Sequence, residues 1–248
     1  MRALGYKPDL ADNRDVRFSA RPSAAGALPT EWSLEQYVEL LNQLSSNSCV
    51  GHGIAGALYV GMRADGEAKP FMPAPLAFYT WGRLETDPEL VDEGTYIRSG
   101  FKGAQRFGIP AMPDWPTDMA LVNQQTPHRV FRAAYDRKGL RGYQRIAMGD
   151  IDGMRRAIFG GSCPVFGITV RQSFLDHTGS GMIEYDKGNL AGGHCLYLCG
   201  YRPGAFRLVN SWGKSWGDDG FAWISEERMG IATDVWNADY DPSRGGVA

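Results

Sequence analysis

The chain has 248 residues and a formal net charge of −2, because 26 basic and 28 acidic side chains nearly cancel. This balance excludes a nucleic-acid-binding protein that depends on a strong basic field, and it excludes a disordered polyanion. A chain of this length can bury about 70–75% of its unfolded surface, so it can form one large domain or two closely packed ones. With 32 glycines and 12% aromatic residues, the sequence indicates a folded globule with many tight turns.

Membrane insertion, secretion and metal binding each lack a sequence signal. The longest mostly apolar stretch, Gly160 to Val170, is about half of the roughly 20 residues that cross a bilayer. The first residues lack the apolar region of a signal peptide, which favours a cytoplasmic location or incorporation in a virion-like particle. Neither a disulfide framework nor the paired clusters of a zinc site is formed by the four cysteines, Cys49, Cys163, Cys195 and Cys199.

Residues 1–27 predict an extended leader with little core of its own. They are polar, and prolines and glycines interrupt them, which favours turns over helices. Its apolar side chains are spaced along an extended strand rather than on one helical face, and we expect four of them to act as anchors: Tyr6, Leu10, Val16 and Phe18. In a larger assembly this leader would act as a tether.

Helices dominate the next hundred residues. Ser48 is a candidate N-cap in front of a run of small residues, and the glycines of this run require a helix that is buried against close neighbours. A second helix is expected over Pro75–Leu84. A third is expected over Tyr96–Phe107, where Gly108 and Pro110 provide a stop signal.

Strands replace helices in the second half. After a short helix over Asp152–Phe159, strands are expected over Pro164–Val170, His194–Tyr201 and Phe206–Asn210. The turn Arg202–Ala205 joins the last two strands as a hairpin. This order of elements predicts an α+β fold with two lobes.

Four residues could form a nucleophile, a base and their supports. Cys49 opens the first buried helix, where free backbone N–H groups and the helix dipole favour the reactive thiolate. Gln43 lies in the segment before it, and its amide could donate to an oxyanion beside the Cys49 backbone N–H. His194 begins one strand of the hairpin and Asn210 ends the other, so the Asn210 oxygen can bind an imidazole nitrogen and fix its tautomer.

These residues stand in three motifs of fixed order. The motifs are Gln43-x5-Cys49, then Gly-Gly-His194, then Asn210-Ser-Trp-Gly-Lys-Ser-Trp216-Gly-Asp-Asp-Gly-Phe221. Together they resemble the papain-like cysteine peptidases, a family with a known spacing of Cys, His and Asn. The resemblance extends from about Leu28 to Trp236.

The resemblance implies a two-lobed papain-like α+β fold. Residues 28–126 would form the helical lobe, residues 127–248 a β-barrel-like lobe, and the active-site cleft would lie between them. It implies a cysteine peptidase that cuts peptide or isopeptide bonds through a thioester. The implied partner is a protein or peptide substrate, and no cofactor and no metal are needed.

The resemblance also assigns roles to single residues. Cys49 would be the nucleophile, His194 the base and acid, Asn210 the orienting residue and Gln43 the oxyanion donor. Trp212 would shield the hydrogen bond between the last two members of the triad from water.

The sequence departs from the family pattern near the nucleophile. Ser46 and Asn47 stand where secreted members carry a bridging Cys and a Gly, and Val50 replaces the usual aromatic residue. Gly193 precedes the histidine where many members carry Asp or Asn. We therefore expect a fold without disulfides from a microbial or phage branch of the family. The leader is too short to fold as a long inhibitory prodomain.

Several neighbouring residues have two readings. Gly94 and Gly193 could bring backbone close to a substrate strand, or they could be plain turn residues. His52 is either part of the site or a buried, hydrogen-bonded side chain. Asp218 and Asp219 are expected in a turn that could also bind a cation weakly. Loop positions are expected for His128 and His177.

Two other functions stay open. One is a catalytically silent structural component of a larger assembly, such as a phage particle, whose other subunits would be its partners. The other is a cysteine amidase or endopeptidase that acts on peptidoglycan. Nucleic acid and membranes are not expected as partners in any of these functions.

Overall fold

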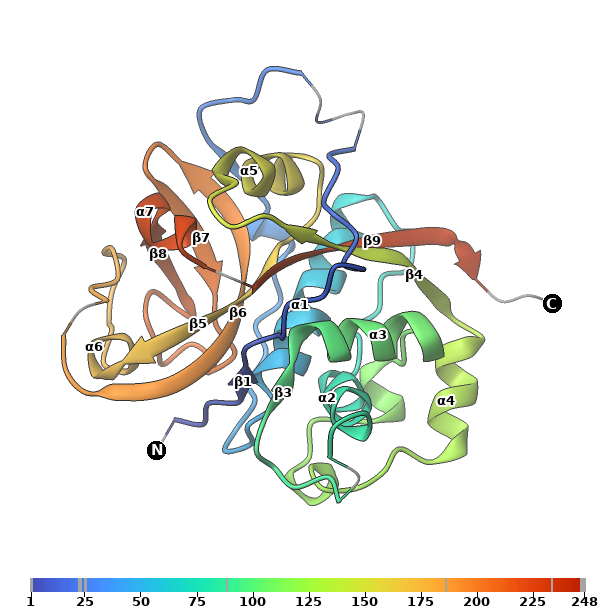
Figure 1. Cartoon of the computed structure of the whole chain (residues 1–248). Coiled ribbons are helices and arrows are strands. Elements are labelled where there is room, and N and C mark those ends of the chain that lie inside the picture. The colour runs from blue at the N-terminus through green and yellow to red at the C-terminus, as the bar shows by residue number, and fades with distance from the viewer. Residues whose placement is uncertain are drawn as a thin grey trace.

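The structure is a computed structural model that describes residues 2–21, 24, 26–87, 89–185, 187–232 and 234–245. In Figure 1 the helices α2, α3 and α4 lie beside one end of a large twisted sheet. The helices are α1 (Cys49–Ala64), α2 (Pro75–Leu84), α3 (Ile97–Phe107), α4 (His128–Tyr135), α5 (Ile151–Phe159), α6 (Gln172–Leu175) and α7 (Glu226–Gly230). The strands are β1 (Tyr6–Lys7), β2 (Trp32–Ser33), β3 (Thr95–Tyr96), β4 (Lys138–Ile146), β5 (Val165–Arg171), β6 (Leu190–Arg202), β7 (Ala205–Val209), β8 (Phe221–Ser225) and β9 (Asp234–Gly245). The α+β class expected from the sequence is confirmed.

Helix α1 is the buried element between the other helices and the sheet. Almost all of its residues are buried, and it packs on α2, α3 and β6. Its glycines allow this close packing, since a methyl group at Gly56 would come within 2.6 Å of the Tyr197 ring. The helix begins at Cys49 as predicted, but the Ser48 hydroxyl makes no capping bond. It lies instead 3.1 Å from Nδ1 of His52.

The other predicted helices agree with the structure, with one correction. Helix α2 has the expected bounds, and α3 ends where expected, at Gly108 with a φ of 94°. Our expectation of a loop at His128 was wrong, because this residue begins α4. That helix is stabilised by Val130 and Ala134, four residues apart and both buried on one face. Over the described residues, no helix has the length and apolar character needed to cross a membrane.

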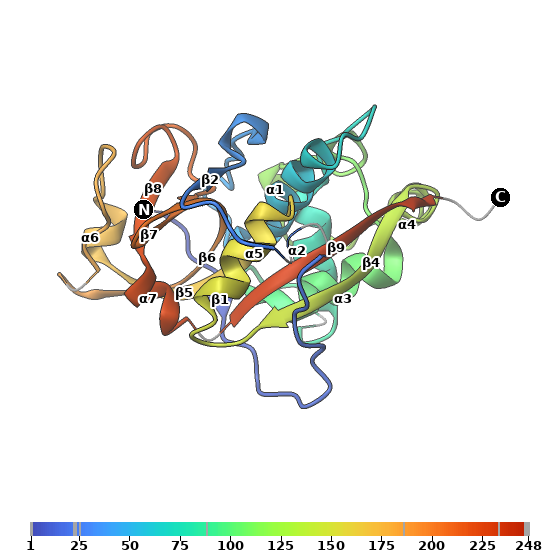
Figure 2. The same cartoon turned by 90° about the horizontal axis from the view of Figure 1, so that it is seen from above.

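The large sheet has the strand order β4-β9-β5-β6-β7-β8, and β2 pairs with β6. All of its pairings are antiparallel. The predicted hairpin is β6–β7, in which Arg202 pairs with Ala205 and Gly204 adopts a φ of 79°. Figure 2 shows β4 and β9 side by side, a pair that the sequence analysis did not predict.

The described residues of the leader pack on the rest of the same chain. Its strand β1 pairs in parallel with β3, and further along Phe18 donates its N–H to the Arg145 carbonyl. Of the four expected anchors, Tyr6 is buried, whereas Leu10 and Val16 are 77% and 59% exposed.

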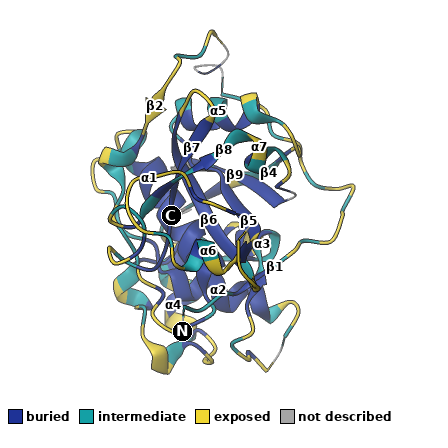
Figure 3. Cartoon of the chain, turned by 90° about the vertical axis from the view of Figure 1, so that its left-hand side faces the viewer, coloured by how far each residue is buried: buried dark blue, intermediate teal, exposed yellow. Residues whose placement is uncertain are grey.

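Exposed loops surround the mostly buried strands of the large sheet in Figure 3. The expected lobe boundaries at residues 27/28 and 126/127 stay a prediction.

Candidate active site

His194 and Asn210 lie side by side on the hairpin β6–β7. The Nε2 atom of His194 donates to Oδ1 of Asn210 over 2.8 Å, and the backbone N–H of Ser211 donates to the same oxygen over 2.7 Å. The ring of Trp212 stacks on the imidazole at 4.4 Å between centroids. Within the described residues, Nδ1 of His194 has no hydrogen-bond partner. One imidazole nitrogen is thus held in place, while the other is free to exchange a proton.

Cys49 is the first residue of α1, and its sulfur is fully buried. Burial raises the pKa of this thiol to about 12, although backbone N–H groups of Cys195, Gly5 and Val50 point at the sulfur and oppose the rise. The sequence argument for a reactive thiolate considered the helix start alone, and burial outweighs it here. Burial also lowers the pKa of His194 to about 4. Both groups are therefore neutral in this arrangement near pH 7.

Gln43 is buried and connected to the same hydrogen-bond network. Its Oε1 accepts from the Ser211 hydroxyl over 2.6 Å, and its Nε2 donates to the carbonyl oxygens of Ser46 at 2.7 Å and Ala3 at 3.2 Å. Ser211 therefore joins Gln43 to Asn210. The sequence analysis assigned no role to Ser211, and its place within the Asn-Ser-Trp-Gly block was the only available signal.

Residues 2–9, here called the covering segment, lie over these side chains. The Gly5 N–H points at the Cys49 sulfur, and the Gly5 carbonyl accepts from Thr95 N–H over 2.8 Å. The Arg2 guanidinium lies 5.0 Å from the centre of the Trp212 ring. Its charge also disfavours an imidazolium at His194. The sequence analysis predicted a tether and not a cover, because no pattern in the leader indicated where it would lie.

Both glycines singled out from the sequence contact the covering segment. A methyl group at Gly94 would overlap the Gly5 carbonyl, and one at Gly193 would overlap the Tyr6 carbonyl. The backbone of the segment thus lies against both of them. His52 is buried and its Nδ1 lies 3.0 Å from the Ser48 carbonyl oxygen, which agrees with the reading as a buried, hydrogen-bonded side chain.

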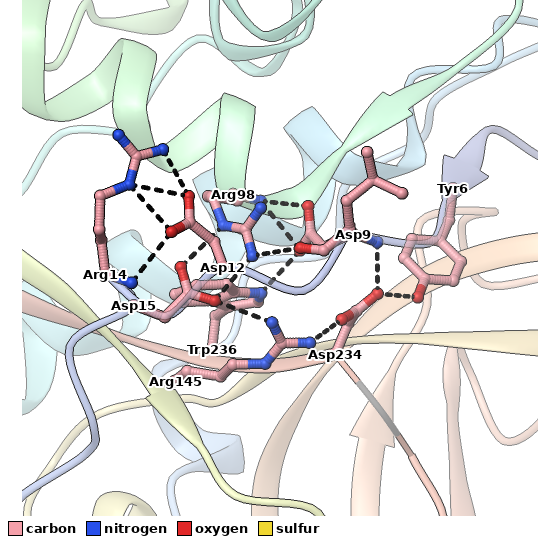
Figure 4. A network of polar contacts seen from close by, with 10 residues as sticks. Tyr6, Asp9, Asp12, Arg14, Asp15, Arg98, Arg145, Asp234 and Trp236 are labelled. Carbon is pink, nitrogen blue, oxygen red and sulfur yellow. Dashed lines mark hydrogen bonds and ion pairs between the residues drawn. The ribbon is translucent and has the colours of Figure 1, made fainter.

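Five charged residues fasten the leader to α3, β4 and β9 (Figure 4). This anchoring cluster consists of Asp9, Asp15, Arg98, Arg145 and Asp234. Asp15 accepts from Arg98 at 2.8 and 2.7 Å and from Arg145 at 2.9 Å. Arg145 also pairs with Asp234, whose second oxygen accepts the backbone N–H of Asp9 over 2.8 Å. The Asp15 carboxylate is therefore bound by two arginine side chains, whereas the Asp9 carboxylate accepts from the backbone N–H of Arg98 and the indole N–H of Trp236.

The acidic pair Asp218 and Asp219, near the end of the block that begins Asn-Ser-Trp-Gly, lies in the expected turn. Asp218 forms an ion pair with Arg207 at 2.7 Å, and Asp219 adopts a φ of 50°. In the described part of the chain, no group of three or more His, Cys, Asp or Glu side chains is placed to hold a metal ion. The four cysteines, all within the described residues, are free. Ser46, at the position of the missing bridge, donates its hydroxyl to the Gln43 carbonyl over 2.7 Å.

Comparison with known proteins identifies the class to which this fold and site belong. Residues 94–238, more than half of the chain, match the papain family of cysteine proteases, and the chain belongs to that family. It is a hydrolase of the cysteine peptidase class with the papain-like fold. The matched range contains His194 and Asn210, whereas Cys49 and Gln43 precede it.

Individual relatives support this assignment. The crystal structure of xylellain, a cysteine protease from Xylella fastidiosa, has a TM-score of 0.86 and 27% identity, with 96% of each chain covered. A peptidase C1-like protein of Acanthamoeba polyphaga mimivirus is 27% identical over 82% of this chain and 70% of its own length. Digestive procathepsin L 3 of Tenebrio molitor shares the fold, with a TM-score of 0.75, 17% identity and coverage of 96% and 76%.

Proposed function

We propose that the chain hydrolyses peptide or isopeptide bonds with Cys49 as nucleophile and His194 as base and acid. The observation that carries this proposal is the histidine itself, whose Nε2 is bound to Asn210 while Nδ1 is unpartnered among the described residues. Asn210 would orient the imidazole, and the stacked Trp212 would keep water from their hydrogen bond. Gln43 and the Cys49 backbone N–H would donate to the oxyanion.

The proposed reaction has two stages, formation of a thioester and its hydrolysis. His194 takes the thiol proton, and the Cys49 sulfur attacks the carbonyl carbon to form a C–S bond and an oxyanion. His194 then protonates the leaving amine, and the C–N bond breaks to leave a thioester. A water molecule gives its proton to His194 and attacks the thioester carbon. The C–S bond breaks, the acid is released and the proton returns to the thiol.

Turnover requires that the covering segment moves away. The Ala3 carbonyl accepts from Gln43 Nε2, the donor proposed for the substrate oxygen. Both members of the catalytic pair are buried and neutral beneath the segment. The arrangement is therefore a latent form of the peptidase. Peptide backbone already lies across the site, which supports a substrate with a peptide backbone; a peptide crosslink of peptidoglycan would be such a substrate as well.

A thiol-labelling experiment tests the proposal. The full chain is treated with an epoxysuccinyl inhibitor, with and without a mild chaotrope that loosens the leader, and the modified residue is located by mass spectrometry. We expect modification of Cys49 that increases as the leader loosens, together with cleavage of a denatured protein substrate. The matched variant His194→Ala should fold, lose cleavage and lose selective labelling. Cleavage that survives Cys49→Ala would contradict the proposal.

A further inference from the structure

The side-chain amide of Gln43 is held by a hydrogen bond at each end. Its Oε1 accepts from the Ser211 hydroxyl, and its Nε2 donates to the Ser46 carbonyl oxygen over 2.7 Å. A carbonyl oxygen can only accept, so this contact fixes which end of the amide is the nitrogen. The second N–H of Nε2 is left for the Ala3 carbonyl, which lies where the proposed substrate oxygen would bind. The Ser46 carbonyl therefore directs the donor toward the site.

The turn from Gln43 to Ser46 needs support from its surroundings. Leu44, its second residue, has a φ of 56°, which leucine rarely adopts and which persists only where the neighbouring structure holds it. The N–H and the hydroxyl of Ser46 both donate to the Gln43 carbonyl oxygen, over 3.2 and 2.7 Å. Whatever fixes the Ser46 hydroxyl therefore also fixes the turn and the Gln43 amide.

The Ser46 hydroxyl is the end of a buried series of hydrogen bonds. It lies 2.6 Å from the Ser48 hydroxyl, which lies 3.1 Å from Nδ1 of His52 in the first turn of α1. The same Nδ1 lies 3.0 Å from the Ser48 carbonyl oxygen. Both serines are fully buried, and only 1% of His52 is exposed. We call Ser46, Ser48 and His52 the Ser–His network.

The protons of this network run in a single direction. Ser46 donates its proton to the Gln43 carbonyl, so its oxygen accepts from the Ser48 hydroxyl. The Ser48 oxygen then accepts from Nδ1 of His52, which must carry a proton because the adjacent Ser48 carbonyl can only accept. Burial lowers the pKa of His52 to about 4, so the ring is neutral near pH 7 and Nε2 is an acceptor, with the Thr117 hydroxyl 3.5 Å away. The last acceptor of the series is the backbone of Gln43.

We propose that the Ser–His network aligns the oxyanion donor of the peptidase, with Ser46 and His52 as positioning residues for Gln43. The inference rests on the proposed function, because it concerns the residue that would donate to the substrate oxygen. All three side chains of the network are buried, so they act on the substrate only through Gln43. A network that merely satisfied buried polar groups would contribute to stability and leave the rate of each folded molecule unchanged.

The tests use an open form of the full chain, defined as the double variant Tyr6→Ala, Asp15→Ala. The first substitution removes the hydrogen bond of the leader to Asp234, and the second removes its bonds to two arginines. Competition from the remaining leader changes KM and not kcat, since a saturating substrate displaces it. An oxyanion donor acts mainly in the transition state, so loss of its alignment lowers kcat. The two effects are therefore read from different constants.

The first test measures kcat and KM for a peptide substrate. We expect Ser46→Ala and His52→Leu each to lower kcat about tenfold without raising KM, a part of the hundred- to thousandfold loss expected for Gln43→Ala. Added to Gln43→Ala, neither substitution should lower kcat further, because the residue through which they act is gone. His52→Asn should retain kcat within about threefold, since its amide keeps an N–H donor as many bonds from the backbone as Nδ1.

A matched serine excludes a general effect of cavity or stability. Ser162 is also buried, and its hydroxyl donates to the Ala157 carbonyl over 3.0 Å. Ser162→Ala should leave kcat unchanged, and thermal unfolding gives the folded fraction of every variant. If His52→Leu does not fold, Ser46→Ala, which removes a single oxygen atom, decides the test. A kcat for Ser46→Ala within twofold of that for Ser162→Ala, or a loss that adds fully to that of Gln43→Ala, would overturn the inference.

The second test does not depend on turnover. Cys49→Ala is added to the open form, and binding of a labelled peptide of residues 2–12 is followed by fluorescence anisotropy. In the docked leader Nε2 of Gln43 donates to the Ala3 carbonyl, so the affinity of the peptide reports the alignment of the same donor. We expect Ser46→Ala to weaken binding about two- to tenfold, and to have no further effect once Gln43→Ala is present.

Together the two tests distinguish failure of the inference from failure of the proposed function. Weaker peptide binding by Ser46→Ala, in a protein whose open form shows neither cleavage nor Cys49 labelling, would refute the proposed function and keep the alignment of Gln43 by the network. Cleavage by the open form at the same kcat in Ser46→Ala and Ser162→Ala would refute the network and keep the function.

Discussion

Replacing Asp15 by alanine should open the proposed active site. The substitution removes three hydrogen bonds that join the leader to α3 and β4, two from Arg98 and one from Arg145. Hydrogen bonds to charged groups contribute about 1.5–3 kcal/mol each when buried. The two arginine side chains are 19% and 22% exposed, so water replaces part of what is lost, and Arg145 keeps its pair with Asp234.

We therefore expect docking of the covering segment to weaken by about 2 kcal/mol in total, which raises the open fraction about thirtyfold. The rate of Cys49 alkylation by iodoacetamide at fixed pH should report this fraction, because the docked segment lies over the thiol, with the Gly5 N–H at its sulfur. Mass spectrometry measures the initial rate in the full chain.

The leader supplies its own matched control. Asp12 lies three residues before Asp15, and its carboxylate pairs with Arg14 of the leader itself. In the Asp12→Ala variant, Cys49 should therefore be alkylated at the same rate as in the unmodified chain. An Asp15→Ala rate within about twofold of the unmodified chain would refute the reasoning, since the expected change is over tenfold larger. Equal acceleration by both variants would refute it as well, because it would show a general loosening of the leader.

Three other outcomes follow from the site. Burial and the neighbouring charge of Asp234 raise the pKa of Asp9 from 3.8 to about 6. The docked leader therefore binds the Asp9 proton more tightly than the undocked leader does. Docking is strongest below about pH 4, and it weakens as the pH rises to about 6. Anisotropy of the peptide of residues 2–12 should show this loss of affinity, and the Asp9→Asn peptide should show a flat profile; loss of affinity toward acid pH would contradict the sign. Cys49→Ala and His194→Ala should each abolish peptide cleavage, measured as kcat/KM, and the double variant should be no worse than either. Asn210→Ala should lose less activity. A loss for Asn210→Ala as large as that for Cys49→Ala, in a folded chain, would mean that the roles are misassigned. Because all four cysteines are free, the thermal unfolding midpoint should be the same with and without reductant, and a fall of several degrees on reduction would reveal a bridge.

Elements with strong local signals could be predicted from the sequence. Helix α2 begins at Pro75 and ends at Leu84 as expected, since proline is favoured at the first helical position. The β6–β7 hairpin follows from the turn at Gly204 between two apolar runs. Strand β4 was missed because its sequence, KGLRGYQRI, lacks a clear apolar alternation. Its pairing with β9 provides the stability that its own sequence does not indicate.

Some parts of the candidate site could be predicted from the sequence and others could not. Cys49, His194 and Asn210 could be named because each stands in a local motif. The contacts of the leader could not be predicted, because Tyr6 hydrogen-bonds to Asp234, a residue 228 positions away in the sequence. The thiol pKa was also beyond a sequence argument, since it depends on burial beneath residues that lie far away along the chain.

The covered site has a consequence for the chemical lifetime of the protein. Thiolates, and not thiols, react with peroxides, and a buried sulfur is also out of reach of the oxidant. Because burial raises the pKa of Cys49 to about 12, its sulfur is a thiol and not a thiolate near pH 7. Under the proposed function, the nucleophile would stay reduced under oxidative stress as long as residues 2–9 are docked. Withdrawal of this segment would expose the sulfur to sulfenic and sulfinic acid formation together with the substrate.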